Sequence, residues 1–149
     1  FVIDCDQHGG NGTAEFTRRL SNLFNYSIYG LAFGCPTYER AETYHIHKTN
    51  GNFSQYILAI HQAFSLALEW KADLIIFQAG MDCHQNDPCG SSWFSTELIQ
   101  KRDEIVFRLA QKHQFPLMFV LAGGYQSLPE LVKLHVSTFQ TAYKTYYAK

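Results

Sequence analysis

Two aspartates and a histidine occupy alternate positions near the start of the chain, at Asp4, Asp6 and His8. In an extended segment alternate side chains point to the same face, so these three groups could converge on one region. A third carboxylate, Asp82, follows another apolar run. Two carboxylates and an imidazole that leave a coordination position open are typical of a catalytic rather than a structural Zn²⁺ site. Solvated acids and one hydrogen-bonded histidine would give the same pattern at a strand end, so the triplet alone leaves both interpretations open.

The segments around these groups alternate between apolar runs and helical periodicity. Strands are predicted at residues 1–5, 26–29, 73–77 and 116–121, and those at 1–5, 73–77 and 116–121 are predicted to be buried. Helices are predicted at 13–24 and 53–70, from Ser95 or Thr96 to His113, and from a capping box at Ser127–Glu130 toward Tyr147. Residues 30–50 show no dominant period and are predicted to be irregular. This alternation predicts an α/β fold with a mainly parallel sheet flanked by helices.

The candidate groups follow the predicted strands. Asp6 and His8 come after the first strand, Asp82 after the 73–77 strand, and Tyr125 after the 116–121 strand on a turn that contains two glycines. In open α/β sheets, ligand groups gather beyond the carboxyl ends of the strands. We therefore expect metal-ligating side chains and a phenol to share one edge of the sheet.

Composition excludes several classes of protein. The chain has 149 residues, and its 12 Lys and Arg against 13 Asp and Glu leave none of the basic excess that binding to a phosphate backbone requires, so direct nucleic-acid binding is not expected. The apolar runs are far shorter than the roughly 20 residues of a membrane span. Four cysteines without CxxC spacing favour reduced thiols in a cytosol-like compartment.

Three segments resemble the motifs of the histone deacetylase superfamily, which includes acetylpolyamine amidohydrolases and acetoin-utilization proteins. Residues 3–13, IDCDQHGGNGT, are similar to that family's DxDxHxGNGT signature. Residues 73–90, DLIIFQAGMDCHQNDPCG, resemble its DLIxxxAGxDxxxxDPxG segment, and residues 121–125, LAGGY, resemble its LxGGY. Three motifs in the same order over nearly the whole chain are far more specific than any one of them.

The resemblance implies an arginase-like or deacetylase-like fold and a site with named roles. Asp6, His8 and Asp82 would be the Zn²⁺ ligands, and the hydroxyl of Tyr125 would polarise the scissile amide carbonyl. Asp4 and Asn11 would orient a tandem histidine pair that serves as general base and acid and that is expected upstream of Phe1. The resemblance also implies a K⁺ or Na⁺ site at Asp4, Asp6, His8, Ser27 and Ile28.

Two of the chain's departures from the family bear on the shape of the site. Gly9 stands where the family usually has His or Gln, which alters the wall beside the ligand histidine. Residues 44–51 resemble the family's LPxGTxD stretch only weakly, so unusual loops are expected at the substrate rim. Because the chain opens inside an apolar run, we expect residues 1–149 to be the C-terminal portion of a single deacetylase-like catalytic domain, incomplete at its N-terminus.

The residues between the motifs carry weaker signals. His84 lies two positions after Asp82, and its sequence context leaves a supporting role beside the ligand and plain exposure equally open. His45 and His47 are interpreted as a solvated strand face, and Cys83 as a packing residue rather than a nucleophile. Tyr143, Tyr146 and Tyr147 of the last helix are interpreted as packing against the sheet, in preference to forming an interaction patch for a partner.

The function expected from these observations is a zinc-dependent amidohydrolase. Its substrate would be an acylated small amine or an acetyl-lysine peptide, hydrolysed in the cytoplasm, or in the nucleus if the protein is eukaryotic. The fragment alone is expected to be inactive. A ureohydrolase of the arginase-like fold would need a second set of acidic metal ligands, which the residues around Asp82 lack. A metal-binding or scaffold protein without turnover is the third alternative.

Overall fold

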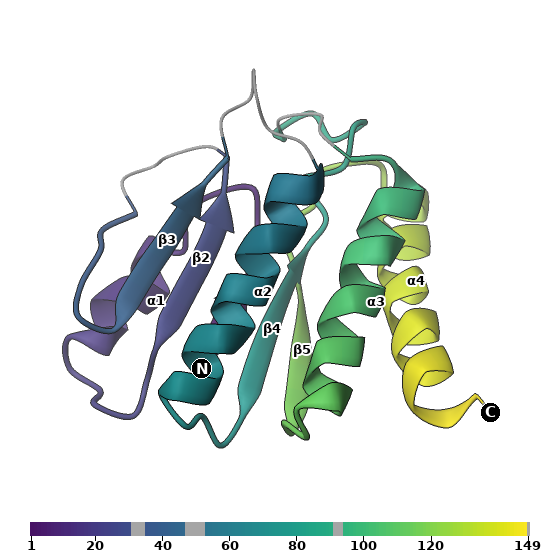
Figure 1. The fold of residues 1–149 in the computed structure, drawn as a ribbon. Helices are drawn as coiled ribbons and strands as arrows, with labels where there is room; N and C mark the ends of the chain where they lie inside the picture. Colours follow the sequence, from purple (N-terminus) through teal and green to yellow (C-terminus); the bar gives the residue numbers. More distant parts are fainter. Residues whose placement is uncertain (31–34, 47–52, 91–93, 149) are drawn as a thin grey trace.

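The computed structural model describes residues 1–30, 35–46, 53–90 and 94–148 (Figure 1). The strands are β1 (Val2–Asp4), β2 (Asn25–Tyr29), β3 (Ala41–His45), β4 (Ile75–Gly80) and β5 (Leu117–Ala122). The helices are α1 (Asn11–Thr17), α2 (Phe53–Glu69), α3 (Thr96–Lys112) and α4 (Leu128–Tyr147). The predicted α/β fold with a parallel sheet is confirmed.

All five strands pair in parallel in the order β3-β2-β1-β4-β5. The connections from β1 to β2 and β3 run one way across the sheet, and those from β3 to β4 and β5 run the other way. Right-handed crossovers therefore place α1 on one face and α2 and α3 on the opposite face, where Figure 1 shows them. The direction reverses between β1 and β4, and the gap beyond their carboxyl ends is where open α/β sheets bind ligands.

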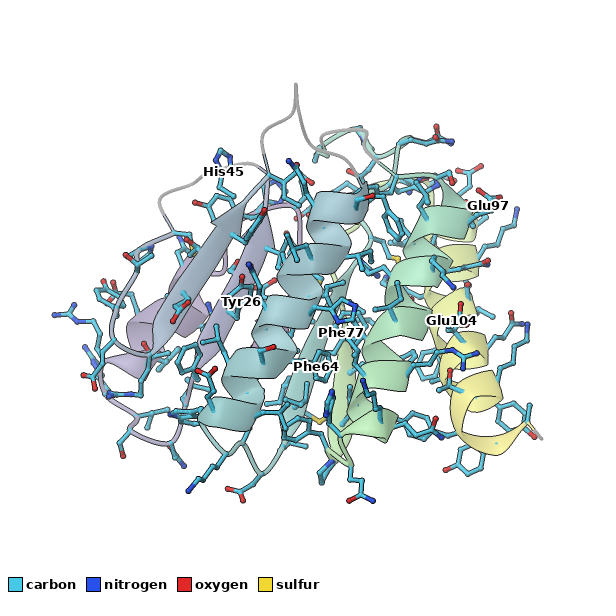
Figure 2. The ribbon with its side chains drawn as sticks, in the orientation of Figure 1. Tyr26, His45, Phe64, Phe77, Glu97 and Glu104 are labelled. Carbon is cyan, nitrogen blue, oxygen red and sulfur yellow. The ribbon has the colours of Figure 1, made fainter. Side chains whose placement is uncertain are left out.

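The core lies between the sheet and helices α2 and α3. Strands β1 and β2 are buried along their whole length because they have neighbours on both sides and side chains packed against both faces. Phe64 of α2 and Phe77 of β4 are fully buried in this layer (Figure 2). The ring of Phe107 on α3 makes edge-to-face contacts with Phe77 and Phe119, which ties α3 to the two strands beneath it.

Strand β5 was predicted to be buried and is instead an edge strand with an open face. Its side chains alternate between half-buried and exposed from Leu117 to Val120, and Leu121 is exposed as well. Phe119 packs toward α3, whereas Met118 and Val120 face the other way and are exposed. A continuous apolar run is not sufficient to predict burial, because burial on both faces also requires elements that cover them.

Three further predictions about the elements are wrong. Residues 41–45 of the segment predicted to be irregular form β3, which pairs with β2 over five positions. The first helix ends at Thr17 rather than Phe24. Phe16 and Leu20, which helical spacing would place on one apolar face, are exposed. Tyr143 and Tyr147 are also exposed rather than packed against the sheet, because α4 packs against α3.

The other helices begin close to their predicted positions. Ser95 is the N-cap of α3, and its hydroxyl accepts a hydrogen bond from the backbone of Leu98. At α4 the Ser127 hydroxyl instead donates to the carboxylate of Glu130. Within the described residues, each helix is too short or too polar to cross a bilayer.

Candidate metal centre

Three side chains from the ends of β1 and β4 meet at the gap where the strand order reverses. One ligand atom from each of Asp6, His8 and Asp82 lies within 4.8 Å of those of the other two. Nδ1 of His8 is 3.1 Å from Oδ1 of Asp6 and 2.9 Å from Oδ2 of Asp82. Two carboxylates and one imidazole nitrogen are ligands that Zn²⁺ accepts, and this set leaves a further position for water or substrate.

Backbone and side-chain donors fix the orientation of both carboxylates. The backbone N–H of Gln7 donates to Oδ1 of Asp82 over 2.9 Å, so the segment that carries two ligands also holds the third. The backbone N–H of His8 donates to Oδ1 of Asp6 over 2.9 Å, and Nε2 of Gln78 donates to Oδ2 of Asp6 over 3.0 Å. Groups that orient ligands in this way are a regular part of metal sites.

The pKa values of Asp6 and Asp82 reflect how close their carboxyl groups lie to each other. Burial, together with the neighbouring Asp6 carboxylate, raises the pKa of Asp82 to about 7. Burial also raises the pKa of Asp6, but hydrogen bonds with Asp82, His8 and Gln78 outweigh this effect and lower it. Oδ2 of Asp82 is buried and, apart from the nearby Nδ1 of His8, has no hydrogen-bond partner among the residues described. A cation between these groups would satisfy that oxygen and remove the repulsion, so the donor set fits a metal ion.

Gly123 closes the site from the side of β5. A Cβ atom built at this position would lie 2.3 Å from Oδ2 of Asp6 and 2.6 Å from Oδ2 of Asp82. The backbone carbonyl of Gly123 also accepts a hydrogen bond from the N–H of Met81, one residue before the ligand. The loop that carries Tyr125 can therefore pass this close to the carboxylates only because position 123 has no side chain.

Gly123→Ala is expected to weaken zinc binding about tenfold or more, since the methyl group must displace one or both carboxylates. Zinc affinity, measured by competition with a chelator, checks this expectation. Gly12→Ala is the matched control, because a Cβ there would contact nothing within 4 Å. Equal affinity in the two variants would show that the carboxylates do not hold the metal.

The ring of Tyr125 stands at the open side of the metal centre. Its centroid is 6.4 Å from that of the His8 ring, and the two planes meet at 76°. The backbone N–H of Tyr125 donates to Oδ2 of Asp87 over 2.8 Å, so the loop after β4 anchors the loop after β5. The side chain is 54% exposed, and partial burial together with the charges of Asp6 and Asp82 raises its pKa. The phenol is therefore protonated at neutral pH and can donate a hydrogen bond.

Asp4 and Ser27 stand beside each other on β1 and β2, at paired positions of the sheet. Both are buried, and burial raises the pKa of Asp4 to about 7. Oγ of Ser27 accepts a hydrogen bond from Gly10, and Ile28 follows in the buried strand. Asn11 is exposed at the start of α1. The structure thus places Asp4, Ser27 and Ile28 together, whereas a monovalent ion there and the predicted roles of Asp4 and Asn11 stay predictions.

The unusual Gly9 has a physical counterpart in the next loop. A Cβ atom at Gly9 would lie only 2.4 Å from Cβ of Cys35. Cys35 therefore occupies the space that a side chain after the ligand histidine would fill. In this chain Cys35, and not a side chain at position 9, therefore forms that part of the wall beside His8.

The remaining polar residues near the site are accounted for by packing. His84 is buried, which excludes the exposed alternative, and its Nε2 lies 3.1 Å from Oγ1 of Thr96. Cys83 is buried, and burial raises the pKa of its thiol to about 12, which agrees with a packing role. His45 is exposed on β3, as predicted, and stacks against Tyr29. His47 lies outside the described residues.

Three supporting residues received no role from the sequence. Gln78 and Asp87 stand inside the recognised motif segments, and the polar type of Gln78 in an otherwise apolar strand was the available signal. Gln78 donates a hydrogen bond to Asp6, and Asp87 accepts one from the backbone of Tyr125. Spacing along the chain does not predict these contacts between distant segments. The third, Arg102 of α3, donates to the carbonyl oxygen of Gly80, two residues before Asp82, although it lies 20 residues from Asp82 in the sequence.

Sequence comparison shows relatives along almost the whole chain. A profile of the histone deacetylase domain matches residues 1–139. The protein named histone deacetylase 2 of Arabidopsis thaliana is 28% identical over 132 residues, which cover 83% of this chain and 33% of that protein. An uncharacterized protein of Picosynechococcus sp. is 24% identical over 148 residues, which cover 97% of this chain and 49% of that protein.

Solved structures share the fold. The acetylpolyamine aminohydrolase of Burkholderia pseudomallei superposes with a TM-score of 0.73 at 17% identity, over 97% of this chain and 44% of that one. The HD domain of HDA15 superposes with a TM-score of 0.71 at 19% identity, over 96% of this chain and 43% of that one. The chain therefore spans between a third and a half of the length of the proteins it matches.

Proposed function

The chain belongs to the histone deacetylase family, and on this premise we propose that it carries most of the metal centre of a zinc-dependent amidohydrolase. The substrate would be the N-acyl amide of an amine, either an acetyl-lysine side chain or an acylated small amine. The observation that carries this proposal is the convergence of Asp6, His8 and Asp82 where β1 and β4 end, with Tyr125 beside them.

Asp6, His8 and Asp82 would hold the zinc ion. When bound, zinc lowers the pKa of a coordinated water and acts as a Lewis acid toward a carbonyl oxygen. Tyr125 would donate a hydrogen bond to the same oxygen as negative charge develops on it. Gln7, Gln78 and Asp87 would keep the ligands and the phenol in place before substrate arrives, which is what makes such a site effective.

The proton transfers need a base and an acid in addition to these groups. Among the described residues, Asp6, His8 and Asp82 are the single cluster of three or more potential metal ligands. In the proposal Asp4 and Asn11 orient a histidine pair that the rest of the protein supplies, and Asp4, Ser27 and Ile28 contribute to a K⁺ or Na⁺ site. The buried Asp4 carboxylate supports the cation, because a charge beside it would offset the cost of burial.

We expect the full-length protein to hydrolyse an acyl amide only when zinc is bound. Removing zinc with a chelator should abolish release of acetate from an acetyl-lysine peptide or an acetylated diamine, and adding zinc should restore it. The isolated 149-residue chain should show no turnover, because the base is not among its candidate groups. Zinc binding without turnover on any acyl amide would instead indicate a scaffold protein, and urea release from a guanidino substrate would indicate a ureohydrolase.

A further inference from the structure

Helix α3 carries a fully buried arginine that faces the end of β4. Arg102 and its neighbour Asp103 are both fully buried, although they stand in the middle of an otherwise amphipathic helix. Figure 2 places Glu97 and Glu104 on the outer side of the same helix. Glu104 pairs there with Lys101 and Arg108, which are ordinary surface contacts. Arg102 is different, because a buried guanidinium is costly unless its charge and donors are matched.

The guanidinium contacts the segment that presents Asp82. Nη1 of Arg102 donates to the carbonyl oxygen of Gly80 over 2.6 Å. Gly80 is the last residue of β4. The neighbouring strand β1 ends at Asp4, which pairs with Gln78, two residues before Gly80. Arg102 thus supplies a donor to a strand-end carbonyl, and two residues later the chain presents the Asp82 carboxylate. The same Nη1 lies 3.5 Å from Sγ of Cys83, so the guanidinium contacts the loop on both sides of the ligand.

Asp103 and Thr138 hold the arginine in this orientation. Nε and Nη2 of Arg102 both lie 2.8 Å from Oδ1 of Asp103. The hydroxyl of Thr138 on α4 donates to Oδ2 of Asp103 over 2.7 Å. The Cζ atom of the guanidinium lies over the Phe77 ring, 5.5 Å from its centroid. Because Asp103 balances the charge, Arg102 adds little net positive charge to the metal centre, and its effect there is geometric.

We propose that Arg102 is a positioning residue that sets the affinity of the metal centre by fixing the Gly80–Cys83 loop. The inference rests on the proposed zinc site. Asp82 is held from one side by the backbone of Gln7 and from the other by this loop. Without the Arg102 contact, the Asp82 carboxylate would keep its hydrogen bond from Gln7, but the Gly80–Cys83 loop that carries it would be free to shift. Altering groups that orient metal ligands typically costs 10–100-fold in affinity.

Two variants of the full-length protein separate positioning from plain stability. Arg102→Lys keeps the charge opposite Asp103 but cannot reach Gly80 and Asp103 with the planar fork. The double variant Arg102→Met with Asp103→Leu removes the ion pair as a unit and leaves no unpaired buried charge, so it is expected to fold even if the lysine variant does not. Arg108→Met is the matched control, because it removes an exposed arginine from the same helix.

Three properties are measured for each variant. They are the zinc affinity, the absorption spectrum of the cobalt-substituted protein, and the melting temperature of the metal-free protein. We expect zinc affinity to fall tenfold or more and the cobalt spectrum to change in the Arg102 variants, with both unchanged in Arg108→Met. Wild-type zinc affinity in a folded Arg102 variant, with only the melting temperature lowered, would overturn this inference alone. Wild-type protein that binds no zinc would overturn the proposed function and this inference together.

Discussion

Asp82→Ala is expected to abolish stoichiometric zinc binding. The carboxylate is fully buried, and apart from Nδ1 of His8, 2.9 Å away, its Oδ2 has no hydrogen-bond partner among the described residues. Removing it leaves one carboxylate and one imidazole, which do not form a tight zinc site on their own. The affinity should fall by more than about 100-fold, since changes to the groups that merely orient ligands already cost 10–100-fold.

The measurement is zinc content per polypeptide after dialysis, together with affinity from chelator competition. Asp82→Asn tests whether charge or shape matters, because the amide keeps the volume and can still accept the hydrogen bond from Gln7. Asp73→Ala serves as the control, since Asp73 is an exposed acid at the other end of the same segment. Wild-type zinc content in Asp82→Ala would refute the ligand assignment.

Tyr125→Phe is expected to lower kcat by about 10²-fold or more in the full-length protein. The phenol stands beside His8 at the open side of the site and is protonated at neutral pH, so it can donate to an oxygen that gains charge. Removing one such donor typically costs 10²–10³-fold in kcat. Because the interaction would form in the transition state, kcat and kcat/KM should fall together.

Zinc content and melting temperature decide whether that loss belongs to the chemistry. Both should stay near wild type, because the side chain is half exposed and the anchoring bond to Asp87 comes from the backbone of Tyr125. Tyr143→Phe is the matched control, since Tyr143 is exposed on α4 far along the chain. A kcat near wild type in Tyr125→Phe would reject the catalytic role.

The sequence predicts the parts of the site that depend on strand ends. Asp6, His8 and Asp82 each follow an apolar strand, and a parallel sheet necessarily brings such ends to one edge. The alternation of strands and helices likewise predicts the fold class. These features follow from local periodicity and from the handedness of the crossovers, so they need no knowledge of side-chain packing.

Other features depend on contacts between segments that are distant in the sequence. The place of β3 at the edge of the sheet is determined by pairing with β2, because its own sequence has no clear alternation. Gly123 matters because two carboxylates lie beneath it, and Arg102 because a strand ends opposite its helix. The open face of β5 shows the same limit, since an apolar strand cannot indicate which neighbours cover it.

The central position of β1 has a consequence for how the protein reaches its native state. The contact between Gln7 and Asp82 joins residues 75 positions apart, so the two halves of the candidate metal centre meet only after a long loop closes. Pairings of this kind form late and slow folding. A zinc ion held by Asp6, His8 and Asp82 would bind the closed arrangement and not the open chain, and would stabilise it in proportion to the free metal concentration. In a cell, zinc supply would then govern how much of the protein survives as folded molecules, apart from any effect on turnover.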